Sequence, residues 1–354
     1  MAYFIWLMLV TAWVVQACPN ACKCSRKSGP RRSEVNCHKR GLRAFPAKLP
    51  SDTWIIRLGE NDITHLKANT LKAAPKIENI NLEQNSIKSF HPQAFSGATQ
   101  LMLLNLYGNR ITNLPQRGFQ DLLNLRVLML GQNEIFLVKP EMFVGMRNLS
   151  DLDLSLNALT MLPPNAFRPL IALKVLDLSL NRLQRFSPKA FNGLQQLMFL
   201  NMDNNSLKMV PAGSLKPLRS LEMLVLDNNL LSTLSPSALE GLSRLQELHL
   251  RNNQLAHLPP DVFRNTPELS QLALSGNHLQ TVDGNVFSRT PDMKKLFLHN
   301  NPWLCDCNIR SMVQWLKRTK CNLSSREALR CESPHELRNK KLINLQTEKL
   351  LCAA

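Results

Sequence analysis

Residues 149–159 read LSDLDLSLNAL, which is the frame Leu149-x-x-Leu152-x-Leu154-x-x-Asn157-x-Leu159. The same frame recurs along the 354-residue chain at a constant interval of 24 residues, without an insertion. Its asparagine, which we call the ladder asparagine, occurs eleven times: Asn61, Asn85, Asn109, Asn133, Asn157, Asn181, Asn205, Asn229, Asn253, Asn277 and Asn301. A constant period over so many copies indicates a repeat array in which each copy packs mainly on its neighbours.

Each copy predicts a short strand followed by a turn. The alternation of Leu152 and Leu154 puts both leucines on one face of the strand, which we expect to be buried. The amide of Asn157 can bond backbone groups of the turn, and stacked copies would satisfy buried polar groups along the array. Strands about 4.8 Å apart on the inside, with bulkier backbone outside, bend such an array. The sequence therefore predicts an α/β repeat, a curved solenoid with a concave parallel β-sheet.

A second apolar column follows ten residues after each ladder asparagine, except the last. We expect it to form a spine beneath the convex side. Its members are Leu71, Phe95, Phe119, Phe143, Phe167, Phe191, Leu215, Leu239, Phe263 and Phe287.

The nine cysteines are confined to the two ends of the chain, where an open solenoid needs caps to cover its apolar faces. Cys18, Cys22, Cys24 and Cys37 precede the first repeat, and Cys305, Cys307, Cys321, Cys331 and Cys352 follow the last one. In an exported chain this distribution indicates disulfides. A zinc site is the alternative, but the Cys-x-Cys spacing and the lack of paired histidines disfavour it.

Residues 1–17 are typical of a secretory signal peptide. An apolar run, Phe4–Val15, is followed by short residues suited to cleavage before Cys18. A membrane anchor fails on length, because a spanning helix needs about 20 apolar residues, and a lipid-attachment site at Cys18 would consume a cysteine that the first cap needs. No second apolar run of spanning length follows, so we expect a released product. The expected segments are a signal peptide 1–17, an N-terminal cap 18–50, eleven 24-residue repeats 51–304 and a C-terminal cap 305–354.

The cap motifs Cys18-Pro19-x-x-Cys22-x-Cys24 and Asn301-Pro302-Trp303-x-Cys305-x-Cys307, together with the repeat frame, resemble those of extracellular leucine-rich-repeat proteins with cysteine-rich caps. The resemblance covers residues 18–352 and implies a horseshoe with disulfide-capped ends. The cystine pairs that it implies are Cys18–Cys24, Cys22–Cys37, Cys305–Cys331 and Cys307–Cys352. Cys321 is left over, either as a buried spare thiol or as an interchain bridge or swapped partner in the cap.

Length, cap spacing and basic ends are most similar to the matrix members of that family. This resemblance implies a secreted extracellular-matrix glycoprotein that binds collagen, integrin-type receptors and heparan sulfate, with no nucleic acid and no membrane insertion. Two alternatives stay open. One is a circulating or immune recognition protein, including a regulatory subunit of a secreted enzyme; the other is a receptor ectodomain that lacks its membrane segment. No nucleophile-elbow, zinc-protease or phosphate-loop motif is present, so we expect neither catalysis nor a cofactor.

The concave face is the expected protein-binding surface. The side chains six, four and two residues before each ladder asparagine point outward and do not pack in the core. These 33 positions hold seven acids and three Lys or Arg, which makes the face acidic within a protein of net charge +17. Apolar side chains rimmed by one sign of charge are typical of protein interfaces. The candidate residues are Leu103, Tyr107, Met129, Asp151, Asp153, Asp177, Phe199, Asp203, Met223 and Asp227. A solvated face with ordinary scatter is the alternative, and calcium at Asp151, Asp153 and Asp177 is disfavoured because adjacent strands provide no loop to wrap an ion.

The positive charge is concentrated at the ends. Residues 18–50 carry nine Lys or Arg and one acid, and residues 305–354 carry ten and five. Such clusters suit sulfate, through the fork of arginine and the point charge of lysine, although a merely solubilising surface is the alternative. The candidate glycosaminoglycan-binding residues are Arg26, Lys27, Arg31, Arg32, Lys317, Arg318, Lys320, Arg338, Lys340 and Lys341.

Three Asn-x-Ser triplets are candidate glycosylation acceptors, at Asn148, Asn204 and Asn322. Asn148 precedes a predicted strand and Asn204 follows one, so a glycan at either position would narrow the usable face from opposite edges of the sheet.

Overall fold

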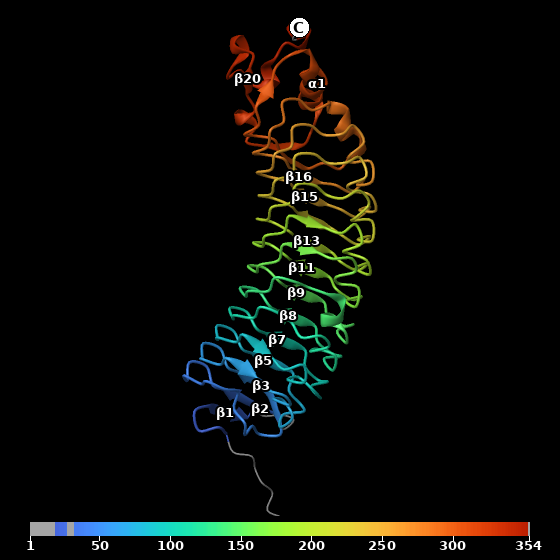
Figure 1. Cartoon of the computed structure of the whole chain (residues 1–354). Coiled ribbons are helices and arrows are strands. Elements are labelled where there is room, and N and C mark those ends of the chain that lie inside the picture. Colours follow the sequence, from blue (N-terminus) through green and yellow to red (C-terminus); the bar gives the residue numbers. More distant parts are fainter. Residues whose placement is uncertain (1–17, 27–31, 353–354) are drawn as a thin grey trace, which may run out of the picture.

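The computed structural model describes residues 18–26 and 32–352 of the chain. The predicted signal peptide and two candidate basic residues, Lys27 and Arg31, lie outside the described residues. The chain forms one elongated, curved solenoid whose two caps lie at opposite ends (Figure 1). The predicted curved repeat solenoid with a parallel sheet is confirmed.

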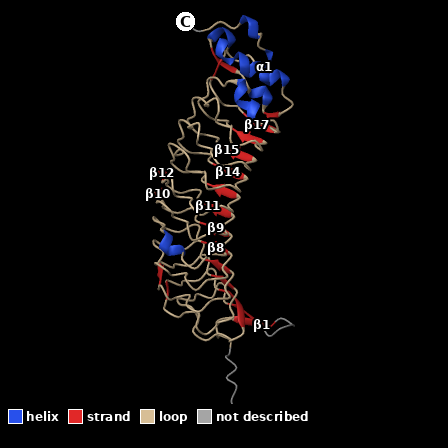
Figure 2. Cartoon of the chain, turned by 90° about the vertical axis from the view of Figure 1, so that its right-hand side faces the viewer, coloured by secondary structure: helices blue, strands red, loops and turns tan. Residues whose placement is uncertain are grey.

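One 14-stranded sheet runs along the whole solenoid and lines its concave side (Figure 2). Its strands are parallel except for the first pair, β1 and β2, which is antiparallel. Their order and bounds are β1 (Lys23–Arg26), β2 (Ser33–Asn36), β3 (Thr53–Arg57), β5 (Asn79–Asn81), β7 (Leu103–Asn105), β8 (Val127–Met129), β9 (Asp151–Asp153), β11 (Val175–Asp177), β13 (Phe199–Asn201), β14 (Met223–Val225), β15 (Glu247–His249), β16 (Gln271–Ala273), β17 (Lys295–Phe297) and β19 (Asn322–Ser324).

The remaining elements are short. Three two-stranded sheets pair β4 (His65–Leu66) with β6 (Ser89–Phe90), β10 (Met161–Leu162) with β12 (Arg185–Phe186), and β18 (Trp303–Leu304) with β20 (Cys331–Ser333). One α-helix, α1 (Arg310–Arg318), lies in the C-terminal cap. The 3-10 turns are η1 (Pro140–Phe143), η2 (Gly284–Arg289), η3 (Cys307–Ile309), η4 (Arg326–Ala328), η5 (His335–Leu337), η6 (Leu342–Asn344) and η7 (Thr347–Lys349).

The ladder asparagines hold neighbouring repeats together. Asn109 illustrates the pattern: its Nδ2 donates to the carbonyls of Leu82, one repeat earlier, and Leu106, both at 3.0 Å, while its Oδ1 accepts from the N–H of Ile87 at 3.0 Å. All eleven asparagines are buried, and each makes the equivalent bonds to its own and the preceding turn. Because these backbone groups are buried, the side-chain amide replaces the water that they would otherwise need. The predicted ladder is confirmed.

The second apolar column is buried along its length, as expected. Phenylalanine rings of neighbouring repeats contact one another: Phe95 and Phe119 stack with centroids 5.9 Å apart, and Phe143 and Phe167 are tilted with centroids 5.8 Å apart. The turn η1, which contains Phe143, lies on the face opposite the strands (Figure 2). Leucines therefore fill the concave half of the core and aromatic rings the convex half.

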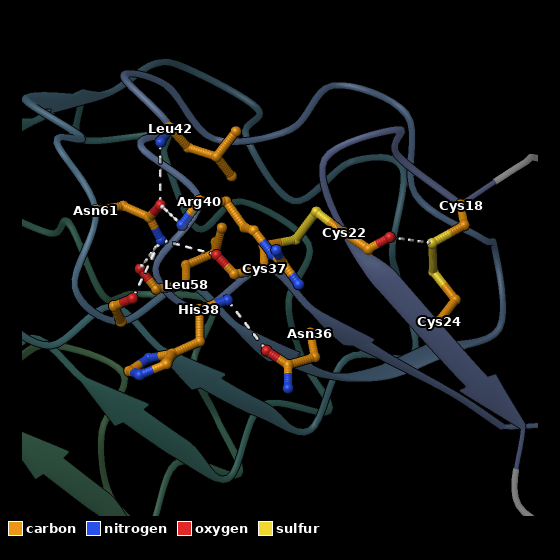
Figure 3. The surroundings of a disulfide bond; sticks show 11 residues. Cys18, Cys22, Cys24, Asn36, Cys37, His38, Arg40, Leu42, Leu58 and Asn61 are labelled. Carbon is orange, nitrogen blue, oxygen red and sulfur yellow. Dashed lines mark hydrogen bonds between the residues drawn. A yellow bond between two sulfur atoms is a disulfide. The ribbon is translucent and has the colours of Figure 1, made fainter.

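The N-terminal cap is closed by two internal disulfides, and hydrogen bonds of the first ladder asparagine join it to the first repeat (Figure 3). Cys18 bonds to Cys24 and Cys22 to Cys37, which are the pairs that the resemblance implies. Asn61 donates to the carbonyl of Cys37 at 2.9 Å and accepts from the N–H of Leu42 at 3.0 Å. The first ladder asparagine thus bonds to the cap in the way that later ladder asparagines bond to the preceding repeat.

The C-terminal cap closes the other end with the two remaining expected pairs, Cys305–Cys331 and Cys307–Cys352. Helix α1 follows the first two cysteines of this cap and buries Met312, Val313 and Leu316. Its Trp315 packs on Phe287, with ring centroids 4.5 Å apart, so the helix ends the aromatic stack.

Candidate protein-binding surface

The three outward columns lie on the concave side, at the first and third residues of each three-residue strand and two residues beyond the third. Their members are mostly half-buried, because neighbouring strands crowd side chains on an inwardly curved sheet. Among the apolar candidates, Leu103, Met129, Phe199 and Met223 are half-buried. Phe199 and Met223 border a shallow hollow that is also lined by Met198, Glu222, Gln246 and Glu247. These side chains are grouped, so together they offer a partner a continuous contact area.

Four carboxylates in the middle repeats form what we call the acidic floor: Asp151, Asp153, Asp177 and Asp203. Within the described part of the chain, none of the four makes an ion pair. They are held by polar neighbours instead. The N–H of Ser155 donates to Asp153 Oδ1 at 2.8 Å, and the N–H of Ser179 donates to Asp177 Oδ1 at 2.8 Å. Their negative charge therefore remains available to a partner.

Burial has a measurable electrostatic consequence on this floor. Desolvation raises the pKa of Asp153 above its usual value, hydrogen bonds from Ser155 oppose that shift, and the neighbouring charge of Asp177 adds to it. A cation that binds above Asp153 relieves this unfavourable desolvated charge. The arrangement is suited to Lys or Arg from another molecule.

A glycine brings an aromatic ring against the floor. A Cβ at Gly131 would lie 2.6 Å from Asp153 Oδ2 and 2.9 Å from ring atoms of Tyr107. A side chain there would displace both groups, so the Tyr107 ring and the Asp153 carboxylate converge over the bare backbone of Gly131. The pair presents an aromatic surface and a charge side by side.

Asp227 differs from the other acidic candidates, because it is buried and already paired. It accepts from the N–H of Arg251 at 2.6 Å and from the Arg251 guanidinium at 3.2 Å. Burial raises the pKa of Asp227, and the bonds from Arg251 and the charge of His249 oppose that shift. His249 also contacts Glu247 at 3.2 Å, and Arg251 lies over the Phe297 ring at 4.8 Å. The acidic patch is thus open over β9 to β13 and closed by an internal network from β14 onward.

The exposed leucines that directly precede two of the ladder asparagines were not identified in the sequence analysis. The residue before each ladder asparagine has a positive φ, and in most repeats it is Asn, Gln or Gly. In two adjacent repeats it is leucine, Leu156 with φ 52° and Leu180 with φ 53°. Both side chains are exposed, at 40% and 46%, and Phe136 nearby is 55% exposed. The signal was present in the sequence as two leucines in a column of otherwise polar or small residues.

The two described basic candidates of the N-terminal cap, Arg26 and Arg32, lie where β1 ends and just before β2 begins. Arg26 approaches Asp52 at 4.0 Å, and Arg32 pairs with Glu78 at 3.0 Å while lying over the Trp54 ring at 5.2 Å. Both arginine side chains stay substantially exposed, at 66% and 45%.

Half of the basic candidates in the C-terminal cap are engaged internally. Lys317 donates to the carbonyl of Leu345 at 2.7 Å, Arg338 pairs with Glu332 at 2.6 Å, and Lys341 pairs with Glu327. The other three are exposed and make no side-chain ion pair among the described residues: Arg318, Lys320 and Lys340.

The three glycosylation candidates are exposed. Asn148 donates to the carbonyl of Leu123 at 2.8 Å, Asn204 donates to Asp203 at 2.7 Å, and Asn322 lies in β19 at the end of the sheet. Cys321 is a half-buried free thiol, and burial raises its pKa to about 11. The described residues contain no group of three or more His, Cys, Asp or Glu side chains placed to hold a metal ion. None of their helices is long and apolar enough to cross a bilayer.

Comparison with known families agrees with this architecture. The leucine rich repeat model matches residues 55–111, 99–159, 147–207, 200–255 and 243–302, and the leucine rich repeat N-terminal domain matches residues 17–50. The repeat matches cover more than half of the chain. The chain therefore belongs to the leucine-rich repeat family, with an N-terminal cap of the same class.

Curated relatives match a smaller part. Leucine-rich repeat-containing protein 3 of Mus musculus is 36% identical over 81 residues, which is 23% of this chain and 31% of that protein. Leucine-rich repeat-containing protein 3B of Homo sapiens is 30% identical over 105 residues, 29% of this chain and 39% of that protein. The matched segments thus span about a third of the length of these relatives.

Solved structures match nearly the whole solenoid. A chain of the octameric complex of Latrophilin 3 (Lec, Olf), Unc5D (Ig, Ig2, TSP1) and FLRT2 (LRR) has a TM-score of 0.80 and 26% identity, covering 95% of this chain and 100% of that chain. A chain of the mouse RP105/MD-1 complex has a TM-score of 0.73 and 23% identity, covering 90% and 54%. At that lower identity the likeness concerns the fold alone.

Proposed function

We propose that this protein is a secreted extracellular-matrix glycoprotein that binds other proteins on its concave face and sulfated glycosaminoglycans through its basic caps. The observation that carries the first part is the acidic floor. Its four carboxylates make no ion pair within the described residues, although half-buried apolar side chains surround them. Apolar contact area bordered by carboxylates that make no ion pair matches the apolar core and polar rim of a protein interface.

An extracellular location is supported by the disulfides. Two disulfides lie within each cap, and such bonds form and persist in oxidising compartments. The apolar N-terminal segment expected to direct secretion is consistent with the same location.

Glycosaminoglycan binding is supported by the placement of the basic residues. Arg26 ends β1 and Arg32 directly precedes β2, Lys27 and Arg31 lie between them in the sequence, and the opposite cap exposes Arg318, Lys320 and Lys340. Because these side chains are exposed, their attraction for sulfate is screened by salt. Heparin affinity should therefore fall steeply as ionic strength rises.

The matrix assignment rests on resemblance. Length, cap spacing and basic ends are most similar to chondroadherin, which implies collagen and integrin-type receptors as the protein partners. Collagen carries charges of both signs, so its basic stretches would face the acidic floor and its acidic stretches the caps. The proposed partners are therefore collagen or a cell-surface receptor, together with heparan sulfate.

Two sets of substitutions separate the two surfaces. The floor variant replaces Asp153 and Asp177 by Ser, whose hydroxyl can still accept from the N–H two residues on. Asn is unsuitable, because it would create new Asn-Leu-Ser acceptors at both positions. The floor variant should lose affinity for protein partners and keep its affinity for heparin. Unchanged affinity for every protein partner would show that the acidic floor is only a solvated surface.

The cap variant replaces Arg26, Lys27, Arg31 and Arg32 by Ala. Its elution from a heparin column should shift to lower salt, while its affinity for protein partners stays that of the wild type. An unchanged elution position would remove the N-terminal cap from the heparin site.

A second candidate function is the ectodomain of a cell-surface protein that assembles with globular partners. It is supported by the similarity over 95% of this chain to a chain of the complex that contains Latrophilin 3, Unc5D and FLRT2. This candidate predicts a stoichiometric complex with a folded extracellular domain, detectable by size-exclusion chromatography with light scattering, and no binding to collagen fibrils.

A further inference from the structure

Leu156 and Leu180 adopt a backbone conformation that their side chains disfavour. Their φ values of 52° and 53° lie in the left-handed region, which bulky L residues rarely occupy. Asn204, Asn228 and Asn252 fill the next three places of the same column, where their short polar side chains tolerate that conformation. The two leucines remain 40% and 46% exposed, so burial in the core does not account for their presence.

The two leucines share one surface hollow with a third exposed apolar side chain. Phe136, 55% exposed, lines it together with Leu156, Ala158 and Leu180, and Glu134 and Arg182 stand at its rim. We call Phe136, Leu156, Ala158 and Leu180 the leucine patch. Clustered apolar side chains rimmed by charges mark interaction sites, whereas single exposed ones need no explanation.

The leucine patch and the acidic floor are built on the same turns. Leu156 follows Asp153 by three residues, and its N–H donates to the carbonyl of Ser179 at 3.0 Å. Leu180 follows Asp177 by three residues, and its N–H donates to the carbonyl of Asp203 at 2.9 Å. An apolar hollow at the ends of β9 and β11 therefore adjoins carboxylates that make no ion pair within the described residues.

We propose that the leucine patch is the anchor site for a basic segment of a protein partner. The segment lays an aliphatic or aromatic side chain into the hollow between Phe136, Leu156 and Leu180, and its Lys or Arg side chains reach Asp153 and Asp177. Charge complementarity selects this partner class: the rim charges Glu134 and Arg182 are of opposite sign, so the carboxylates of the acidic floor set the net charge beside the hollow. The inference rests on the proposed function and adds to it a specific edge of the sheet and a specific chemistry of the partner.

A glycan is the competing occupant. Asn204 is the next member of the column after Leu180, it is exposed, and it is an Asn-x-Ser acceptor. A sugar attached there would reach the hollow from the C-terminal side and could cover it. The experiment must therefore tell a protein segment from the protein's own glycan.

The test uses the mature, glycosylated full chain and a phage-displayed library of random linear peptides. The patch variant replaces Leu156 and Leu180 by Asn, a residue that four neighbours in this column already carry. The control variant replaces Leu123 and Ile171, which are both 51% exposed and lie before strands β8 and β11, by Asn. None of these four substitutions creates an Asn-x-Ser/Thr triplet. Thermal unfolding of each variant confirms that it is folded.

The expected result is enrichment of peptides that combine Lys or Arg with an apolar side chain. Their affinity should fall about tenfold or more on the patch variant, as for the loss of interface anchors, and stay unchanged on the control variant. Equal binding to the wild type and the patch variant, or no enrichment at all, would overturn the proposal. If peptides bind the patch variant as well as the wild type but lose affinity for the floor variant, the proposed function is retained and only the anchor site is refuted. Binding that emerges only after Asn204→Gln would assign the hollow to the glycan instead.

Discussion

The ladder asparagines make a quantitative prediction at Asn157, which lies four residues after Asp153. Asn157 Oδ1 accepts from the N–H of Ile135 at 2.9 Å, and its Nδ2 donates to the carbonyls of Leu130, Leu154 and Ser155 at 2.9, 3.2 and 3.0 Å. Asn157→Ala removes all of these bonds from a site that is 8% exposed.

The four backbone groups are not affected equally. The Ile135 N–H loses the acceptor that it has within the described residues, and a buried donor without a partner costs about 1–3 kcal/mol. Each of the three carbonyls keeps a second donor, so these losses together add about 1 kcal/mol. We expect Asn157→Ala to lower the free energy of unfolding by about 2–4 kcal/mol. The retained donors are Asn133 Nδ2, Asn181 Nδ2 and the N–H of Gln132.

Equilibrium unfolding in urea, followed by circular dichroism, measures this loss. Asn124→Ala is the matched control, because it removes the same side chain from an exposed site where one bond, to the Thr99 carbonyl at 2.8 Å, is lost. The control should lose less than about 1 kcal/mol. A loss below about 1 kcal/mol at Asn157, or one equal to the control, would refute the view that the ladder holds the repeats together.

Three further predictions concern the concave face and the C-terminal cap. Asp153→Ser should raise the thermal midpoint at about pH 7 and have little effect at about pH 3. Burial lifts the folded-state pKa, so the cost of the charge is absent below the unfolded-state pKa and complete above the folded-state pKa. A lower midpoint at neutral pH contradicts this. Gly131→Ala should weaken binding of protein partners in a surface-plasmon-resonance assay, because its Cβ displaces Tyr107 and Asp153, and unchanged affinity would exclude that pair from the interface. Cys321 should react with iodoacetamide much more slowly at about pH 8 in native than in unfolded protein, since its pKa is raised to about 11, and equal rates would show an open thiol.

The fold could be predicted from the sequence because its period is constant. Once one copy is assigned as strand and turn, every Asn and every Phe of the two columns follows by counting, and the structure buries them all. The caps are a different case. Cysteine spacing indicated disulfides, but the particular pairs came from the family resemblance, since several connectivities fit the same spacing.

The candidate surface could be predicted only as a set of positions. Counting from the ladder places Asp177 and Asp227 in equivalent columns, but Arg251 turns toward Asp227 and neutralises it, and no period specifies a side-chain torsion. Similarly, the Lys317 ammonium donates to the Leu345 carbonyl, a contact between residues 28 positions apart in the sequence. The left-handed backbone of Leu156 could be found only from the Asn and Gly residues of its column, because leucine by itself gives no hint of a positive φ.

The central claim is that the concave face binds an extracellular protein, and binding to fibrillar collagen tests it most directly. Wild type and the Asp153→Ser/Asp177→Ser variant would be passed over immobilised fibrils at physiological salt, with heparin binding as the check that each protein is active. The account predicts saturable binding by the wild type, a clear loss in the variant, and equal heparin binding by both. Absence of collagen binding by heparin-active wild type, or equal binding by the two proteins, would contradict it.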